Sequence, residues 1–104
     1  MITDKDFLVK EDLQKRVIDT SHKALIKWGE EGAIYGLMEE MAELNLELSR
    51  IRRGRHNSED ILEELVDVYM CVIEAAMIYG VDRFNDMLKT KIDKFEKQVN
   101  KDEE

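Results

Sequence analysis

Proline is absent from all 104 residues, and glycine occurs only five times. These two residues most often interrupt helices and form tight turns, whereas the good helix formers Leu, Glu, Lys, Met and Ala are abundant. The sequence therefore predicts an all-α fold. Because a chain of this length supplies one core rather than two, we expect residues 1–104 to form a single helical domain.

Apolar residues recur at steps of three and four in four segments, which is the periodicity of helices with one buried face. The spacing predicts helices over about residues 10–27, 31–53, 58–79 and 82–99. Gly29 and Gly32 are expected to interrupt the chain after the first segment, and Gly54 and Gly80 to end the second and third. We expect a four-helix bundle-type subunit, with flexible ends at about residues 1–9 and 100–104.

The chain is acidic, with 24 Asp and Glu against 16 Lys and Arg and a formal net charge of -8. Nucleic-acid backbones are held mainly by Lys and Arg, so we expect no nucleic-acid partner, and a polyanionic ligand would need a cation as intermediary. No segment approaches the length of a membrane span, and the first residues lack an apolar leader core. We therefore expect a soluble cytoplasmic protein, with the single Cys71 as a core residue.

Carboxylates are concentrated on the second predicted helix, where Glu40, Glu43 and Glu47 fall on one side and border its apolar stripe. A pair of carboxylates three residues apart on a helix can bind one ion. The alternative is a solvated helix face, because Glu is a good helix former, and for this cluster alone that alternative is favoured.

The sequence of the third predicted helix favours ion binding over a solvated helix face. After Glu64 its sequence is LVDVYMCVIEAAMIYG, which is apolar on nearly every face and predicts a helix buried all round. Asp67 lies inside this run, so we expect it to point into the protein, where an unpaired carboxylate would cost several kcal/mol. Glu64 precedes it by three residues and repeats the spacing of Glu40 and Glu43.

Two such pairs on neighbouring antiparallel helices could face each other across a narrow gap. Converging carboxylates repel one another unless a hard cation takes their oxygens, so Mg²⁺ is the expected ion, with Mn²⁺ as a possible substitute. A di-iron bundle would need Glu-x-x-His motifs, which the sequence lacks, and zinc prefers His and Cys ligands. His22 and His56 do not pair with the acidic clusters.

The motif Glu39-Glu40-x-x-Glu43, followed by Glu64-x-x-Asp67, resembles the EExxE and ExxD signature of the MazG-like all-α nucleoside triphosphate pyrophosphohydrolases. This superfamily also includes dimeric dUTPases and phosphoribosyl-ATP pyrophosphatases, and the resemblance covers about residues 25–95. It implies that Glu40, Glu43, Glu64 and Asp67 ligate Mg²⁺. Glu39 would be a supporting or water-orienting carboxylate.

The resemblance implies an enzyme that hydrolyses a nucleoside triphosphate to the monophosphate and pyrophosphate, by attack of water on the α-phosphorus. An enzyme restricted to dUTP or dCTP is an alternative, because base selectivity depends on pocket shape that no motif encodes. An alternative from another class is a non-catalytic helical interaction module whose acidic clusters are structural.

Basic and aromatic residues could complete a substrate site, although each has a structural alternative. Lys91 and Lys94 match the place where similar proteins carry a Lys or Arg for the phosphates, but a solvated helix face is as good an interpretation. Arg55 could reach polyphosphate from the loop RIRRGRH, or this basic loop could simply complement a helix dipole. Trp28 could stack on a base, or anchor a core or a subunit contact.

The predicted third helix is apolar on more faces than a lone small subunit can cover. Its extra faces are expected to pack against another subunit. We therefore expect at least a homodimer, and the resemblance also allows a homotetramer.

Overall fold

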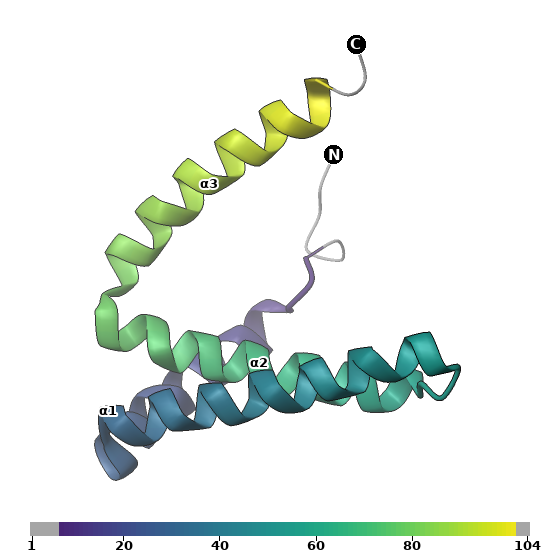
Figure 1. Ribbon diagram of the computed structural model, residues 1–104. Helices are drawn as coiled ribbons and strands as arrows, with labels where there is room; N and C mark the ends of the chain where they lie inside the picture. Colours follow the sequence, from purple (N-terminus) through teal and green to yellow (C-terminus); the bar gives the residue numbers. More distant parts are fainter. Residues whose placement is uncertain (1–6, 102–104) are drawn as a thin grey trace.

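A computed structural model of the protein describes residues 7–101 (Figure 1). Within this range the chain forms α1 (Glu11–Ser49), the short 3-10 helix η2 (Arg50–Arg53), α2 (Ser58–Tyr79) and α3 (Val81–Lys101), and it has no strand. The predicted all-α class is confirmed. None of these helices is long and apolar enough to cross a bilayer.

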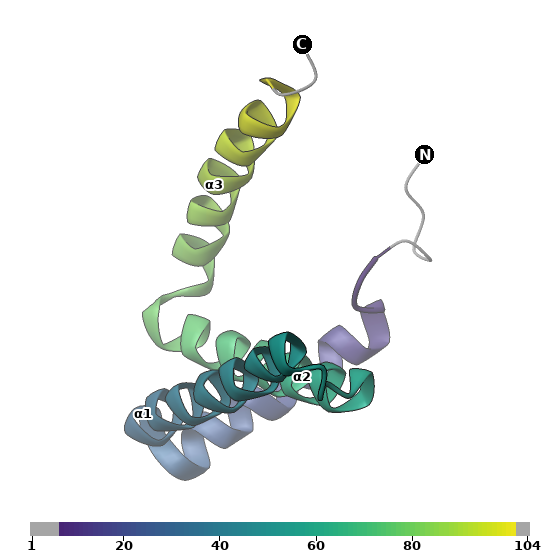
Figure 2. The same cartoon turned by 45° about the vertical axis from the view of Figure 1, so that its right-hand side comes forward.

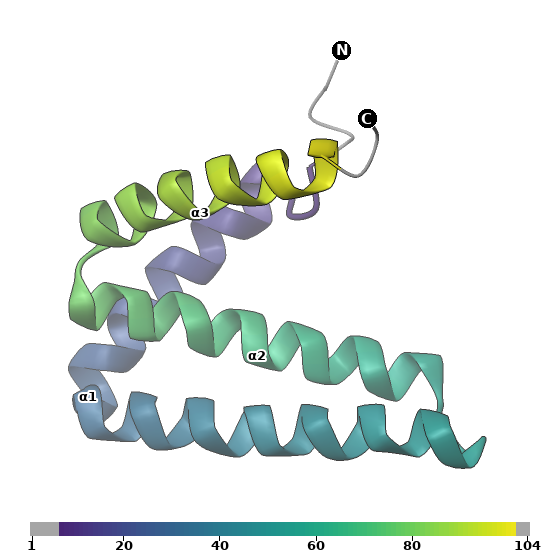
Figure 3. The ribbon, with the colours of Figure 1, turned by 45° about the horizontal axis from the view of Figure 1, so that its top comes forward.

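Helix α1 is divided by a sharp bend at Gly29. This residue has φ 82° and ψ 170°, a backbone conformation that residues with a side chain rarely adopt. We call residues 11–28 the first arm of α1 and residues 30–49 the second arm. The two arms diverge from the bend, so the predicted separation of the first two helical segments is confirmed at Gly29 (Figure 3). The expectation for Gly32 is wrong, because this residue is helical and lies within the second arm.

The second arm of α1 and α2 run side by side in opposite directions and form a hairpin (Figure 3). The last turn before the loop tightens into η2, and Gly54 ends it in the left-handed conformation with φ 67°. Asn57 then caps α2, because its side-chain oxygen accepts hydrogen bonds from the backbone N–H groups of Glu59 and Asp60. We call the two arms of α1 together with η2 and α2 the hairpin unit.

Helix α3 follows α2 directly through Gly80, whose φ of 114° makes an elbow. Beyond this elbow α3 leans away from the hairpin unit instead of packing along it (Figures 1 and 2). The described part of one chain therefore does not form a four-helix bundle. Helix α3 includes Asn100 and Lys101, the first two residues of the predicted flexible tail, while residues 1–6 and 102–104 lie outside the described range.

The interior of the single chain is small. Among residues 7–101, Ala33 is the only buried hydrophobic residue and Ser21 the only buried polar one. The prediction that the third helix is buried all round is wrong for one chain: no residue of α2 is buried, and Cys71 is only half-buried. The physical reason is that the arms of α1 cover one side of α2, whereas α3 does not fold back over the other.

Candidate metal centre

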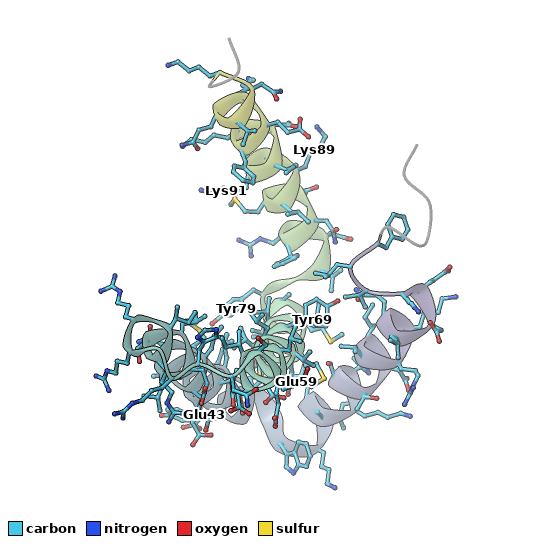
Figure 4. The ribbon with its side chains drawn as sticks, turned by 90° about the vertical axis from the view of Figure 1, so that its right-hand side faces the viewer. Glu43, Glu59, Tyr69, Tyr79, Lys89 and Lys91 are labelled. Atoms are coloured by element: carbon cyan, nitrogen blue, oxygen red, sulfur yellow. The ribbon has the colours of Figure 1, made fainter. Side chains whose placement is uncertain are left out.

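Glu40, Glu43 and Glu64 bring their carboxylates together from the second arm of α1 and from α2. One oxygen of each residue can be chosen so that all three atoms lie within 4.8 Å of one another. Glu40 and Glu43 are one turn apart on the same side of α1, and the antiparallel course of α2 carries Glu64 to them. Figure 4 shows the oxygen atoms gathered around Glu43 between the two helices. Three of the four predicted ligands are thus neighbours.

Asp67 lies at the edge of this group rather than within it. It is half-buried, not fully buried as its apolar neighbours in the sequence predicted. It is nevertheless close enough to act electrostatically on both helices, because its charge contributes to raising the pKa of Glu40 and of Glu64. Asp67 therefore contributes to the negative electrostatic potential at the cluster, although the oxygens that lie within 4.8 Å of one another belong to Glu40, Glu43 and Glu64.

The environment of the cluster opposes ionisation. Desolvation raises the pKa of Glu40, the negative charges of Glu43, Asp67 and Glu39 raise it further, and a hydrogen bond with Glu64 acts in the opposite direction. Desolvation also raises the pKa of Glu64, followed by the charges of Glu43 and Glu40. A nearby cation would reverse this effect, because it favours the charged form of every carboxylate around it.

Two oxygens in the cluster have no hydrogen-bond partner among the described residues. The Oε2 atoms of Glu40 and Glu64 are both shielded from solvent and unpaired. An unpaired buried carboxylate oxygen is costly, so some donor or cation is needed there. Carboxylate oxygens are the ligands that Mg²⁺ and other hard divalent cations prefer, so the donor set fits such an ion.

Glu47, which the sequence grouped with Glu40 and Glu43, has a cation of its own. Its side chain is only 13% exposed, and its Oε1 accepts a hydrogen bond of 2.8 Å from Nη1 of Arg50. The ion pair spans one turn at the end of α1. Glu47, the third acidic residue of this helix side, is thereby engaged with Arg50 rather than with the group of three glutamates, although its Oε2 is shielded and unpaired like those of Glu40 and Glu64.

A pocket of about 290 Å³ adjoins the cluster, between the first arm of α1 and α2. Glu40 and Asp67 form part of its wall, and the other lining residues are Val17, Thr20, Ser21, Ala24, Met70, Cys71 and Glu74. Two hydroxyls and several apolar side chains thus face the same space as the carboxylates. The hydroxyl of Tyr69 donates to Oε1 of Gln14, which joins α2 to the first arm beside this pocket.

Glu74 is a pocket residue that the sequence analysis missed. It follows Asp67 by seven residues, two helical turns, and therefore lies on the same side of α2. Desolvation raises the pKa of the Cys71 thiol, and the charges of Glu40, Glu74 and Asp67 raise it further. The sequence itself indicates a role for Glu74, because this charged residue lies within the same apolar run as Asp67.

The structure does not bring the remaining predicted site residues to the cluster in one chain. Glu39 is exposed beside Glu40, and Trp28 is 68% exposed with Nζ of Lys27 at 5.1 Å from its ring centre. Trp28 does not line the pocket. Its exposure does not fit a core anchor within a single chain.

The predicted basic residues are also exposed. Lys91 and Lys94 lie on α3, where they flank a shallow pocket with Phe95 and other α3 residues. Figure 4 shows Lys91 well apart from Glu43. Arg55 is exposed in the loop before α2, where its backbone N–H donates to the carbonyl of Arg50.

Comparisons with protein-family models, with curated proteins and with solved structures find no match for this chain. The carboxylates, their spacing in the sequence and their positions in the fold are therefore the features that indicate a function.

Proposed function

We propose that the protein is a Mg²⁺-dependent nucleoside triphosphate pyrophosphohydrolase, which converts a (d)NTP and water to a (d)NMP and pyrophosphate. The observation that carries this proposal is the convergence of Glu40, Glu43 and Glu64 from two antiparallel helices. The motif that these residues form with Glu39 and Asp67 supports the same substrate class. An acidic protein needs a cation to approach a polyphosphate, and this cluster is suited to hold one.

Glu40, Glu43 and Glu64 would hold the metal, with Asp67 as a fourth ligand from the edge of the cluster. Bound Mg²⁺ would neutralise the charge of the polyphosphate and make water a better nucleophile. In the proposed reaction, the water oxygen bonds to the α-phosphorus, the bond to the bridging oxygen breaks, and pyrophosphate leaves with the electron pair. Glu39, exposed beside Glu40, is available to accept the proton of the water.

The pocket beside the carboxylates is proposed to receive the nucleoside. Its volume of about 290 Å³ is at the lower end of the range of small-molecule sites. Apolar side chains such as Val17 and Met70 could contact a base, while the hydroxyls of Thr20 and Ser21 could bind polar edges. An enzyme selective for dUTP or dCTP remains an alternative. We also propose that Lys91, Lys94 or Arg55 contacts the phosphates. Base stacking by Trp28 is a further, separate proposal.

The test is pyrophosphate release by the full chain with Mg²⁺ and a panel of ribo- and deoxyribonucleoside triphosphates. Glu43→Gln should reduce the rate by about 100- to 1,000-fold, because charge stabilisation at the reacting phosphate is the main contribution expected of the site. Glu31→Gln makes the same change at an exposed position of the same arm and should keep full activity. Circular dichroism verifies that both variants remain helical. Full activity of Glu43→Gln would show that the metal assignment is wrong.

A helical interaction module is the second candidate, and the exposed apolar residues of α3 favour it. It predicts no heat of Mg²⁺ binding in calorimetry and no hydrolysis of any triphosphate. It also predicts that neutral replacements at Glu40, Glu43, Glu64 and Asp67 are tolerated together. Calorimetry with the wild-type chain therefore separates the two candidates without a substrate.

A further inference from the structure

Glu74 is a half-buried carboxylate that the proposed reaction does not use. It lines the pocket of about 290 Å³ between the first arm of α1 and α2. Among residues 7–101, no Lys, Arg or His lines this pocket, and none of the ion pairs includes Glu74. A ligand that enters the pocket displaces water from this carboxylate, so it must supply hydrogen-bond donors in exchange.

The position of Glu74 relative to the carboxylate cluster suits the base of a nucleotide. Glu74 follows Asp67 by two turns on the same side of α2, which is about 10 Å along the helix axis. Both residues line the pocket. This span is comparable to the length of a nucleoside monophosphate from its phosphate to the far edge of its base. A nucleotide whose α-phosphate lies at the cluster therefore extends its base toward Glu74.

The hydrogen-bonding edge of each base determines which base a carboxylate accepts. A carboxylate has two acceptor oxygens and no donor. Guanine presents two adjacent donors, the ring N1–H and the amino group at C2, which match these two oxygens. Adenine and cytosine have a ring acceptor beside their amino group, and uracil and thymine have one ring N–H between two carbonyls. A carboxylate repels the acceptors on these four edges, so it favours guanine.

The wall that the first arm of α1 contributes suits the remaining polar atoms of guanine. Thr20 and Ser21 line the pocket from this arm, and Ser21 is only 7% exposed. A hydroxyl can donate a hydrogen bond as well as accept one. These two residues can therefore serve the O6 and N7 acceptors of guanine, which Glu74 cannot bind. Val17 and Met70 provide apolar surface for the faces of the ring.

We propose that Glu74 selects guanine in this pocket, by accepting hydrogen bonds from N1–H and from the amino group at C2. The preferred substrates are then guanine nucleoside triphosphates. This inference rests on the proposed function, because that function places a nucleotide beside the carboxylate cluster. Glu74 determines specificity and takes no part in breaking the bond at phosphorus. Its replacement should therefore change which base is bound.

Calorimetry of the full chain with Mg²⁺ and GMP, IMP or AMP tests the proposal. IMP keeps the N1–H but lacks the amino group, whereas AMP has an acceptor at N1. GMP should bind about tenfold more tightly than IMP, because one hydrogen bond to a charged group is lost. GMP should bind about 100-fold more tightly than AMP, because both hydrogen bonds are lost.

Glu74→Gln should reverse the preference, because the amide can donate to N1 of adenine while its oxygen accepts from the amino group at C6. GMP binding should weaken by about tenfold, and AMP binding should strengthen by about tenfold. A purely structural role of Glu74 would not exchange the two bases. Glu59→Gln makes the same change at an exposed position of α2 outside the pocket and should bind like the wild type.

Circular dichroism verifies that the variants remain helical, and Glu74→Ala replaces Glu74→Gln if the latter does not fold. Glu74→Ala should bind GMP, IMP and AMP with nearly equal affinity. The proposal is overturned if wild-type GMP does not bind, if GMP is not preferred over IMP, AMP, CMP and UMP, or if the Glu74 variants keep the wild-type preference. Hydrolysis is not measured here. A chain that binds GMP selectively but releases no pyrophosphate from any triphosphate would overturn the hydrolase proposal alone.

Discussion

The hairpin unit and α3 are both helical, but they differ in how far contacts within the chain cover their apolar side chains. In the hairpin unit the bend at Gly29 lets both arms of α1 contact α2, and carboxylates from the two helices meet between them. Helix α3 leaves the elbow at Gly80 with its apolar side uncovered. The comparison divides the molecule into a hairpin unit that gathers carboxylates between its helices and a helix α3 that leaves its apolar side uncovered.

The largest stability effect expected from this division is stabilisation by Mg²⁺. At a concentration 100 times its Kd, Mg²⁺ should add about 2.7 kcal/mol to the free energy of unfolding, because it binds the folded state only. Thermal melts with and without Mg²⁺, at one protein concentration, measure the effect. Glu43→Gln should lose most of it, whereas Glu96→Gln on α3 should keep it. Equal Mg²⁺ stabilisation of both variants would contradict the proposal that the metal binds in the hairpin unit.

The bend at Gly29 provides the next test. A Cβ at this residue meets no atom within 4 Å, but φ 82° with ψ 170° is strained for any residue with a side chain. Gly29→Ala should therefore destabilise the protein by about 1–3 kcal/mol. Gly36→Ala, in a helical and open position, should stabilise it by about 0.5–1 kcal/mol. If denaturant unfolding shows that both variants change the free energy of unfolding in the same direction, this account of the bend is contradicted.

A smaller effect is expected where α2 begins. Removing the Asn57 cap in Asn57→Ala should cost about 1 kcal/mol, because two backbone N–H groups at the start of α2 lose their acceptor. In α3, the side chain of Asn85 only donates to the carbonyl of Val81 one turn earlier. Asn85→Ala should change stability by less than about 0.5 kcal/mol. Urea unfolding compares the two, and equal losses would argue against a special role of the cap.

The smallest expected effect is a pH dependence of the metal-free protein. Because the pKa values of Glu40 and Glu64 are raised by folding, the folded chain holds protons that the unfolded chain releases above its ordinary pKa of 4.5. The stability associated with these groups is therefore greatest below that value and falls as the pH rises through the folded pKa values. Melting temperatures in the presence of a chelator, from about pH 5 to about pH 8, measure this decline.

Two variants separate this decline from the general effect of net charge. Glu64→Gln removes one titrating group from the cluster, so it should flatten the decline and be more stable than the wild type at neutral pH without metal. Glu96→Gln removes the same charge from α3 and should leave the decline in place. A decline that both variants change equally would mean that overall charge, rather than the cluster, causes it.

The site was more predictable than the packing around it. The spacing of Glu40 and Glu43 on one helix side, and its repetition at Glu64 and Asp67, needs only helical periodicity. Glu74 lies outside the motif, although a carboxylate at any position of this apolar run is expected to need a compensating group for the same physical reason as Asp67. The basic residues could not be placed, since Lys91 lies on a helix whose direction depends on the elbow at Gly80.

By itself the sequence determined the all-α class, the breaks at Gly29, Gly54 and Gly80, and the sides of the helices on which the carboxylates lie, because these follow from local backbone preferences and helical periodicity. Only the tertiary structure decided that three glutamates meet while Asp67 stands at their edge and Glu47 pairs with Arg50. It also decided that α3 departs from its own hairpin unit. Such outcomes depend on contacts between residues far apart in the chain, which periodicity along one helix does not specify.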